Sequence, residues 1–431
     1  MSNSPTDGEE PSKPGLRGFL QRNQTLLSLL LPALLLGIGR GFTLPVLPAI
    51  AMGFGVSVAA GGLLVIAPMV GSVASTLPTG YFIDKVGRRR VLIVAPVLIA
   101  ISAALVLRAT TYVELVAYMF INGAGQQMWQ MSRLAAIADS GKARQRGRQI
   151  TGMAALQRFG SLGGPFIGGV VGELFGLRIP FAMFAVMAVL AAALMYLIMA
   201  ETAPAVLARQ EAKRTGKAAA APTEPAPDTS WRALITRPVI ALFIAQFSAN
   251  VGRGGAQGQG GVYLLFAAYA FGVGPATLGT VTLATGLVGV PLTFLSGQIM
   301  DRFGRKRSVV PAAAVLGMGL ALMSATAWFG WPFGAFVGSF VWINLAVSLM
   351  SGSMQTIGAD VAPPTARGKF FGVNRLVAEA GSLGNPTAFS TATAVVAGGA
   401  GYALAFGVMG VFAFTASFVI GVFIRETLRK D

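Results

Sequence analysis

The sequence predicts an all-α membrane protein in which twelve transmembrane helices form two pseudo-symmetric six-helix bundles. Its composition, its apolar runs and its internal repeats each support this prediction. Of the 431 residues, 54% are hydrophobic and only 11% are charged, and the mean hydropathy is +0.68. A water-soluble domain of this size does not need so apolar a composition.

The apolar runs are mostly about 20 residues long, which is the length of helix that crosses a hydrocarbon core of roughly 30 Å. Short breaks that are charged or rich in Gly and Pro separate them. The predicted spans, numbered 1 to 12, are 25–50, 57–79, 90–108, 112–138, 149–174, 179–200, 239–270, 276–298, 308–328, 332–360, 369–395 and 400–424. The seventh span is the longest and the least regular.

A stretch rich in Ala, Pro and charged residues divides the spans into six and six, and its composition is typical of a linker. The first 24 residues are polar, so span 1 is expected to direct insertion itself. The predicted domains are a cytoplasmic tail (1–24), an N-terminal bundle (25–200), a cytoplasmic linker (201–236), a C-terminal bundle (237–424) and a cytoplasmic tail (425–431).

The basic residues are distributed unevenly across the predicted membrane. Of 33 Lys and Arg residues, 26 lie in the termini and in alternate loops on one side, whereas only Arg108 and Arg178 lie in the opposite loops. This asymmetry follows the positive-inside rule and predicts a cell inner-membrane protein with both termini in the cytoplasm. The net charge of +17 therefore indicates topology, and no nucleic-acid partner is expected because no reader fold is visible.

Several kinds of chemistry are excluded by residues that the sequence lacks. It contains neither Cys nor His, which excludes disulfides and thiolate or imidazole metal sites. Each Gly-Lys pair is followed by Ala or Phe, so no phosphate-binding loop of an ATPase is present. We therefore expect no enzyme activity, no cofactor and no metal.

Four motifs recur between the two halves of the chain. "GYFIDKVGRRR" at 80–90 returns as "GQIMDRFGRKR" at 297–307, and the pattern "AD", six residues, then "RG" starts at 138 and again at 359. "GSLGGP" at 160–165 returns as "GSLGNP" at 381–386, and "GRG" at 39–41 returns at 252–254. The separations of 217, 221, 221 and 213 residues change only slowly, which indicates a duplication in the same orientation.

The first of these motifs resembles the signature that the major facilitator superfamily carries between spans 2 and 3. The resemblance extends over residues 25–424 and implies that family's twelve-helix fold and transport by alternating access. The matching residues are Gly80, Asp84, Lys85, Gly87, Arg88 and Arg89, with a weaker copy at Gly297, Asp301, Arg302, Gly304, Arg305 and Lys306.

The resemblance implies that these loops form a conformational latch. The glycine allows close helix packing, and the arginines can reach a carboxylate at the base of a neighbouring helix. By resemblance, the latch of the first half lies near the start of span 11 and holds the bundles in the outward-open state. The predicted latch residues are Gly80, Asp84, Arg88, Asp139, Asp301, Arg305 and Asp360.

Four charged residues lie deep inside predicted spans. At 1.5 Å per residue, Arg40 and Arg253 lie roughly 22 Å into spans 1 and 7, and Arg158 and Glu379 lie roughly 12 Å into spans 5 and 11. A central arginine costs at least about 2.5–3.5 kcal/mol to insert, so each should face a wet interior. The alternative is that backbone carbonyls or Glu379 hold them.

Polar residues recur at helical spacing in spans 4 and 7, where they should line a cavity or tie helices together. Beyond both deep arginines the helix is weakened, by Pro45 and Pro48 in span 1 and by Gly258 and Gly261 in span 7. Matched interruptions are the best sequence indication of a transporter's binding region. The predicted substrate-binding residues are Arg40, Arg253, Arg158, Gln126, Gln130, Asn250 and Gln257.

Span 5, with "GMAALQRFGSLGGPFIGG", resembles the antiporter signature of the superfamily's exporters, and the resemblance implies export in exchange for protons. Span 4 departs from the drug antiporters, because Arg133 is followed by Leu-Ala-Ala and no acid lies deep in the span. The predicted proton-coupling residue is Glu379. The predicted partners are a small organic molecule, protons and the lipid bilayer, and a monomer is expected.

Two alternatives remain open. The interior charge of +2 from three arginines and Glu379 suggests a substrate with an anionic group. The paired Arg40 and Arg253 resemble the arrangement in the organophosphate/phosphate exchangers of the superfamily, which implies anion exchange or uptake. The second alternative is a lipid flippase or a sensor that does not transport.

Overall fold

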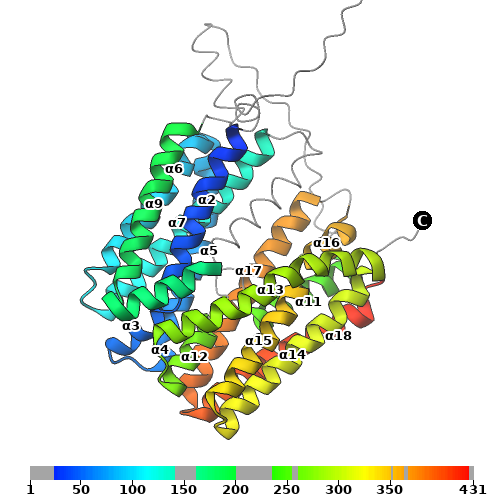
Figure 1. The fold of residues 1–431 in the computed structure, drawn as a ribbon. Helices are drawn as coiled ribbons and strands as arrows, with labels where there is room; N and C mark the ends of the chain where they lie inside the picture. Colours follow the sequence, from blue (N-terminus) through cyan, green and yellow to red (C-terminus); the bar gives the residue numbers. More distant parts are fainter. Residues whose placement is uncertain are drawn as a thin grey trace, which may run out of the picture.

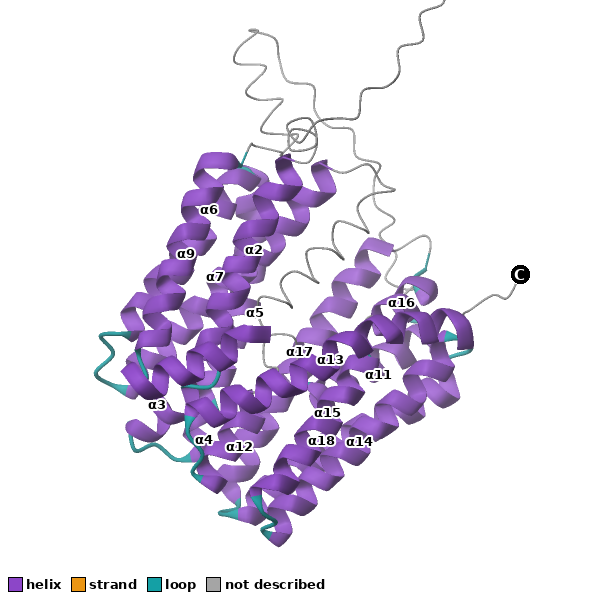
Figure 2. Ribbon diagram, in the orientation of Figure 1, coloured by secondary structure: helices purple, strands orange, loops and turns teal. Residues whose placement is uncertain are grey.

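The computed structural model of the protein describes residues 24–140, 162–199, 235–254, 261–350, 353–363 and 367–426. Throughout these ranges the chain forms helices joined by turns and short loops, and it contains no strand (Figure 2). The predicted N-terminal tail before residue 24 and the linker up to residue 234 lie outside the described residues.

The first six spans form one bundle of helices (Figure 1). Span 1 is divided into α2 and α3, and span 2 begins with the short α4 before α5. The bounds are α2 Gln24–Thr43, α3 Leu47–Gly53, α4 Val58–Gly61, α5 Leu63–Val86, α6 Arg88–Val106, α7 Tyr112–Ser140, the span 5 helix Leu162–Phe175 and α9 Ile179–Ile198.

The last six spans form the second bundle, in which spans 7 and 10 are each divided in two. The bounds are α11 Arg237–Arg253, α12 Gly261–Phe271, α13 Pro275–Phe303, α14 Arg305–Phe329, α15 Phe333–Leu349, α16 Ser353–Val361, α17 Arg367–Val395 and α18 Gly399–Phe423.

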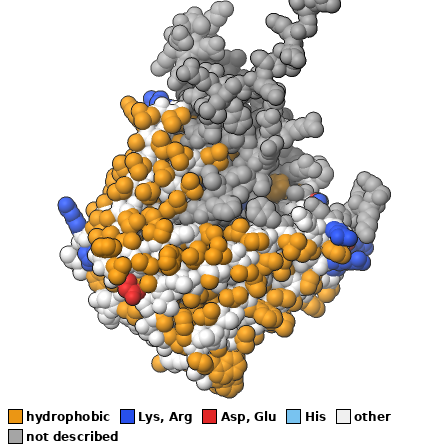
Figure 3. Space-filling model, in the orientation of Figure 1, with side chains coloured by type: hydrophobic (Ala, Val, Ile, Leu, Met, Phe, Trp, Pro, Cys, Tyr) orange, Lys and Arg blue, Asp and Glu red, His pale blue; other side chains and the backbone are white. Residues whose placement is uncertain are grey.

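The described helices have the length and the surface of membrane spans. Seven are long and apolar enough to cross a membrane, or eight if the pair α2 and α3, bent by 40°, is one span. Helices α7 and α17 are each 29 residues long but carry Arg, Asn and Gln or Glu side chains. The face shown in Figure 3 is mostly hydrophobic, with Lys and Arg near its edges. The predicted all-α, twelve-span fold is confirmed.

Each bundle has its own apolar core. The core of the first bundle is built mainly of Leu, Ile and Ala side chains from α2, α5, α6, α7 and α9. The core of the second bundle contains a cluster of aromatic rings around Phe266, whose ring lies 4.8 Å from that of Tyr402 and 5.2 Å from that of Phe406. Val65 of the first bundle also belongs to this second core, so the two bundles share apolar packing at one place.

The helix packing repeats between the halves. Helix α9 packs against α2 and α6, and α18 packs against α11 and α14 in the same way. Because α2 corresponds to α11 and α9 to α18 in the duplicated sequence, the repeat seen in the motifs is also a repeat of helix pairs.

The halves meet where α3 and α4 lie beside α12 and α17 (Figure 1). Hydrogen bonds between described residues join them: Tyr269 Oη to Val56 O (3.0 Å), Ser390 Oγ to Ala59 O (2.6 Å) and Ala276 N to Glu173 Oε2 (3.0 Å). We call this the far end. Helices α5 and α13 both begin there, so the basic loops that follow them lie at the other end, the basic end.

Candidate functional site

The repeated glycine motifs contact each other inside the first bundle. In "GRG" of α2, Gly41 lies against Gly164 of "GSLGGP" in the span 5 helix. A Cβ added to Gly164 would lie 2.8 Å from both Gly41 Cα and the Ile38 carbonyl oxygen. Both positions therefore require glycine, and the two backbones touch directly beside Arg40.

The corresponding contact in the second bundle uses a side chain. Asn385 of "GSLGNP" takes the place of Gly164, and its Nδ2 donates a hydrogen bond to Val251 O at 2.8 Å. Gly254, which corresponds to Gly41, lies beside the same amide. Sequence reasoning missed Asn385, although the change from GSLGGP to GSLGNP was a visible signal.

Arg40 lies in the last turn of α2, directly before the interruption of span 1. Thr43 Oγ1 donates to Arg40 O (2.9 Å), and the helix ends at Thr43. The chain resumes as α3 at Leu47, with Pro48 in its first turn. The predicted interruption is confirmed, and the half-buried Arg40 side chain lies at its edge.

Arg253 is the final residue of α11, and Gly254, with φ +71, ends the helix. Its guanidinium donates from Nε (3.2 Å) and Nη2 (3.0 Å) to the Asn250 side-chain oxygen. Asn250 Nδ2 in turn donates to Gln246 O at 2.7 Å, and both amide side chains are buried. This chain of bonds orients a half-buried cation at the end of a helix.

The polar stripe of α7 is used partly within the first bundle. Gln126 Nε2 donates to Asn122 Oδ1 (2.6 Å), and Asn122 Nδ2 donates to Ser102 Oγ on α6 (2.9 Å). Gln130 accepts from Arg133 Nη2 at 2.5 Å. The part of the stripe around Asn122 therefore ties helices together, which is one of the two uses that the sequence predicts.

A second polar face of α7 was not predicted. Gln127 accepts from Ser72 Oγ (3.1 Å) and donates to Thr76 Oγ1 (3.2 Å), so it joins α7 to α5. Of the remaining predicted binding residues, Arg158 and Gln257 lie outside the described residues. The structure therefore brings Asn250 and Arg253 into contact. The roles of Arg158 and Gln257 stay predictions.

Glu379 forms an ion pair on its own helix. Its Oε1 lies 2.7 Å from Arg375 Nη2, one turn earlier in α17. The Glu379 side chain is 22% exposed and that of Arg375 is 59% exposed, so the arginine is the more accessible member of the pair. The role of Glu379 in proton coupling stays a prediction.

The latch residues of the second half form a pair at the basic end. Arg305 forms an ion pair with Asp360, and its backbone N donates to Glu426 Oε1 at 2.9 Å. In the first half, Arg88 Nη1 donates to Ile83 O at 3.3 Å. The side chains of Asp84, Asp139 and Asp301 lie outside the described residues.

The described residues show no close packing at the latch glycines, and the expectation stays a prediction. Among the described residues, no atom outside the immediate backbone lies within 4 Å of a Cβ added to Gly80 or Gly297. The described contacts between the halves concentrate at the far end instead, which fits a state in which the basic end is separated.

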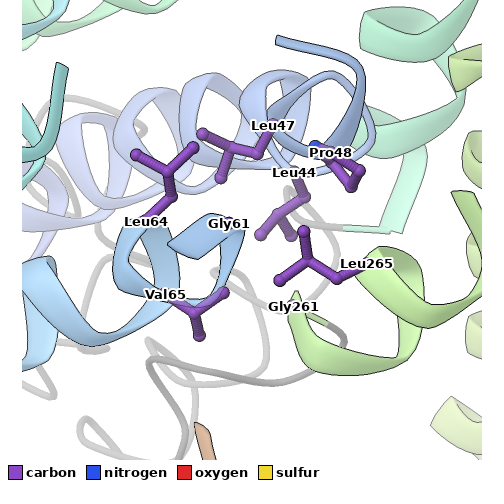
Figure 4. A pocket seen from close by; sticks show the side chains of 8 residues that line it. All are labelled: Leu44, Leu47, Pro48, Gly61, Leu64, Val65, Gly261 and Leu265. Atoms are coloured by element: carbon purple, nitrogen blue, oxygen red, sulfur yellow. The ribbon is translucent and has the colours of Figure 1, made fainter. Parts of the chain in front are cut away.

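The two interrupted spans meet at the far end. Figure 4 shows a small apolar pocket between them, to which span 1, α4 with α5, and α12 contribute. The lining residues are Leu44, Leu47, Pro48, Gly61, Leu64, Val65, Gly261 and Leu265. None of these side chains carries a polar group. The contact between the two interrupted spans, beyond the two deep arginines, is therefore apolar.

Gly169 allows the halves to close, and replacing it should open the far end. A Cβ at Gly169 would overlap the Pro275 carbonyl oxygen and lie 2.9 Å from its carbon. Overpacking of this kind costs about 1–3 kcal/mol, so Gly169→Ala should lower the closed-to-open ratio roughly 5- to 150-fold. A thiol introduced by Leu265→Cys should then be labelled faster, and its labelling rate is the measurement. The chain has no cysteine of its own.

Gly163→Ala is the matched control, because it lies on the same helix and meets no described atom within 4 Å. Its labelling rate should equal that of the parent. An unchanged rate in Gly169→Ala would show that this contact does not limit opening.

Glu173 places a negative charge on the far-end N-terminus of α13. Its carboxylate accepts from Ala276 N across the two halves. Since an anion at a helix N-terminus is favoured by about 0.3–1 kcal/mol, Glu173→Gln should raise labelling at the same thiol roughly two- to fivefold. Glu114→Gln is the control, because Glu114 accepts from Thr110 N (2.8 Å) within one bundle. Equal effects of the two changes would contradict the assignment.

Comparison with known proteins gives similar sequences and folds. The model of the Major Facilitator Superfamily matches residues 29–386. Multidrug resistance protein 2 of Bacillus subtilis (strain 168) is 22% identical over 313 residues, which cover 72% of this chain and 75% of that protein.

Solved structures share the fold over nearly the whole chain. The D-xylose-proton symporter matches with a TM-score of 0.72 and 20% identity, covering 94% of this chain and 98% of its own. The inward open conformation of the xylose transporter XylE from E. coli matches with a TM-score of 0.70 and 19% identity, covering 93% and 96%. A peptide transporter, POT, in complex with alafosfalin matches with a TM-score of 0.71 and 13% identity, covering 92% and 93%.

Proposed function

Because this chain belongs to the Major Facilitator Superfamily and is a multi-pass membrane transporter rather than an enzyme, we propose that it exports a small organic compound in exchange for protons. The two bundles rock about a central pathway that opens alternately at the basic end and the far end. The observation that carries the proposal is that both deep arginines precede a helix interruption and that the two interrupted spans meet at the closed far end.

The charge distribution supports an orientation of the protein in the membrane. Under the positive-inside rule, the basic end and both termini face the cytoplasm. The far end then faces outward, and the conformation described here is inward-facing. The multidrug resistance protein among the relatives supports export, and the glycine contacts of the span 5 helix support an antiporter.

Arg253 and Arg40 are proposed to bind the substrate, and the former has the clearer geometry. Asn250 accepts from two of its N–H groups, which fixes the orientation of the guanidinium. Such a fork suits a carboxylate, sulfonate or phosphate group on an otherwise apolar molecule. Arg158, Gln126, Gln130 and Gln257 remain proposed contributors.

Anion exchange is the second candidate function, and the paired arginines favour it. It requires no proton-carrying residue, whereas export driven by protons requires one, for which Glu379 is proposed. A flippase or a sensor without transport is the third candidate, and no observed contact favours it.

The test uses the purified full chain in proteoliposomes with an imposed pH gradient. A thermal-shift screen of organic anions, organic phosphates and amphipathic dyes first identifies a ligand. Uptake or release of that ligand should follow the gradient if protons drive export. Counterflow that ignores the gradient but requires phosphate or an organic phosphate on the opposite side would favour exchange, and binding without flux would favour a sensor.

A further inference from the structure

The two deep arginines occupy different positions relative to the ends of their helices. Helix α2 continues to Thr43, three residues beyond Arg40, whereas α11 ends at Arg253 itself. In the duplicated sequence these arginines are equivalent, so α11 stops one turn earlier than its counterpart. The second bundle must therefore contain something that stabilises this early ending.

An early ending leaves backbone carbonyls of the last turn without intrahelical partners. Gly254 N donates to Asn250 O (3.0 Å) and closes the final helical bond. The next carbonyl is that of Val251, and α11 has no further helical N–H for it because the helix ends at Arg253. Asn385 Nδ2 donates to this carbonyl at 2.8 Å from α17, 134 residues away in the chain.

The first bundle provides the comparison. There the helix continues past Ile38, and the position of Asn385 is taken by Gly164, whose backbone touches Gly41. The carbonyl of Ile38 is then served by its own helix, so no side-chain donor is needed. At this position a side-chain amide is present in the second half, where the Val251 carbonyl lies at the helix end, and a glycine is present in the first half, where the Ile38 carbonyl lies inside the helix.

Asn385 is also held firmly. Its side chain is 1% exposed, and its Nδ2 lies 3.4 Å from the sulfur of Met409 on α18. Burial of a polar side chain without a hydrogen bond is costly, so this geometry is kept only while the bond to Val251 is made. The amide thereby joins α11, α17 and α18 next to Arg253.

We propose that Asn385 is the positioning residue for Arg253: by capping the Val251 carbonyl it ends α11 at Arg253 and directs the guanidinium into the pathway. This rests on the proposed role of Arg253 in binding an anionic group. A cation at a helix C-terminus is also favoured by the helix dipole, and Arg253 is the final residue of α11.

The test is a double-mutant cycle on flux of carboxyfluorescein, an amphipathic organic anion, in proteoliposomes. Asn385→Leu keeps the shape of the side chain and removes the donor. It should raise KM roughly three- to tenfold, the scale of one neutral hydrogen bond, with the maximal rate within about twofold. In the Arg253→Ala background the same change should have almost no further effect on KM.

Ser382→Ala is the matched control, because Ser382 is buried in α17 and its hydroxyl, among the described residues, donates within that helix, to Ala378 O at 2.9 Å. It should leave KM unchanged. If Asn385→Leu raises KM equally with and without Arg253, the effect is general packing and the proposal is overturned.

A second measurement does not depend on the substrate. Arg253→Cys introduces a single thiol into a chain without cysteines, and its labelling rate reports the position of the end of α11. Asn385→Leu should change this rate at least threefold, and Ser382→Ala should not. A change in labelling without any dependence of flux on Arg253 would refute the proposed binding role while retaining the positioning, and no change in labelling would overturn the positioning.

Discussion

Replacing Glu379 with glutamine is expected to abolish transport driven by a pH gradient while preserving counterflow of the same ligand. Glutamine keeps the size and a hydrogen-bonding oxygen for Arg375, but it cannot gain or lose a proton. In proteoliposomes, accumulation against a gradient should fall to the level of empty vesicles. Exchange of labelled for unlabelled ligand across the membrane should continue at a rate within about threefold of the parent.

Glu114→Gln serves as the control for this experiment. Glu114 is half-buried at the far end, where its carboxylate caps the start of α7. The change should leave both accumulation and exchange intact. Accumulation that survives in Glu379→Gln would assign proton coupling to another residue, and loss of both activities would indicate that Glu379 is needed for binding or folding.

Replacing Arg253 with alanine is expected to weaken binding of an anionic ligand by roughly 10- to 150-fold. This corresponds to one charged hydrogen bond of about 1.5–3 kcal/mol. The same range is expected for Arg40→Ala if both arginines hold the anion. Thermal-shift titration measures the change without any assumption about the direction of transport.

Arg253→Lys separates charge from geometry. Lysine keeps the positive charge but cannot present two parallel N–H groups to the Asn250 oxygen, so we expect it to recover only part of the affinity. Arg108→Ala, which removes an exposed arginine from a far-end loop, should change nothing. Equal affinities of the parent and Arg253→Ala for every anionic ligand would exclude Arg253 from the binding site.

Much of the architecture could be predicted because membrane insertion depends on local hydropathy. Each span is recognised from its own residues, and the repeated motifs could be aligned without knowing their contacts. The interruption after Arg40 was also visible, since Pro45 and Pro48 cannot continue an ordinary helix. The twelve-span fold therefore followed from the sequence.

The candidate site was harder to predict because polar side chains have alternative partners. Asn122, on the predicted stripe, bonds to Ser102 of α6, whereas Asn250 bonds to Arg253 in its own helix. Helical spacing assigns both to polar faces, but only packing decides which face meets another helix. Glu379 likewise bonds to Arg375, a neighbour that sequence spacing allows but does not require.

By itself, the sequence determined the number of spans and the duplication and predicted the depth of Arg40 and Arg253, because these depend on the order of residues along the chain. The tertiary structure alone decided which end is closed and that Asn385 reaches Val251. Those features depend on contacts between residues far apart in the chain. A buried carbonyl must find a donor wherever the fold supplies one, and no local pattern specifies from which helix it comes.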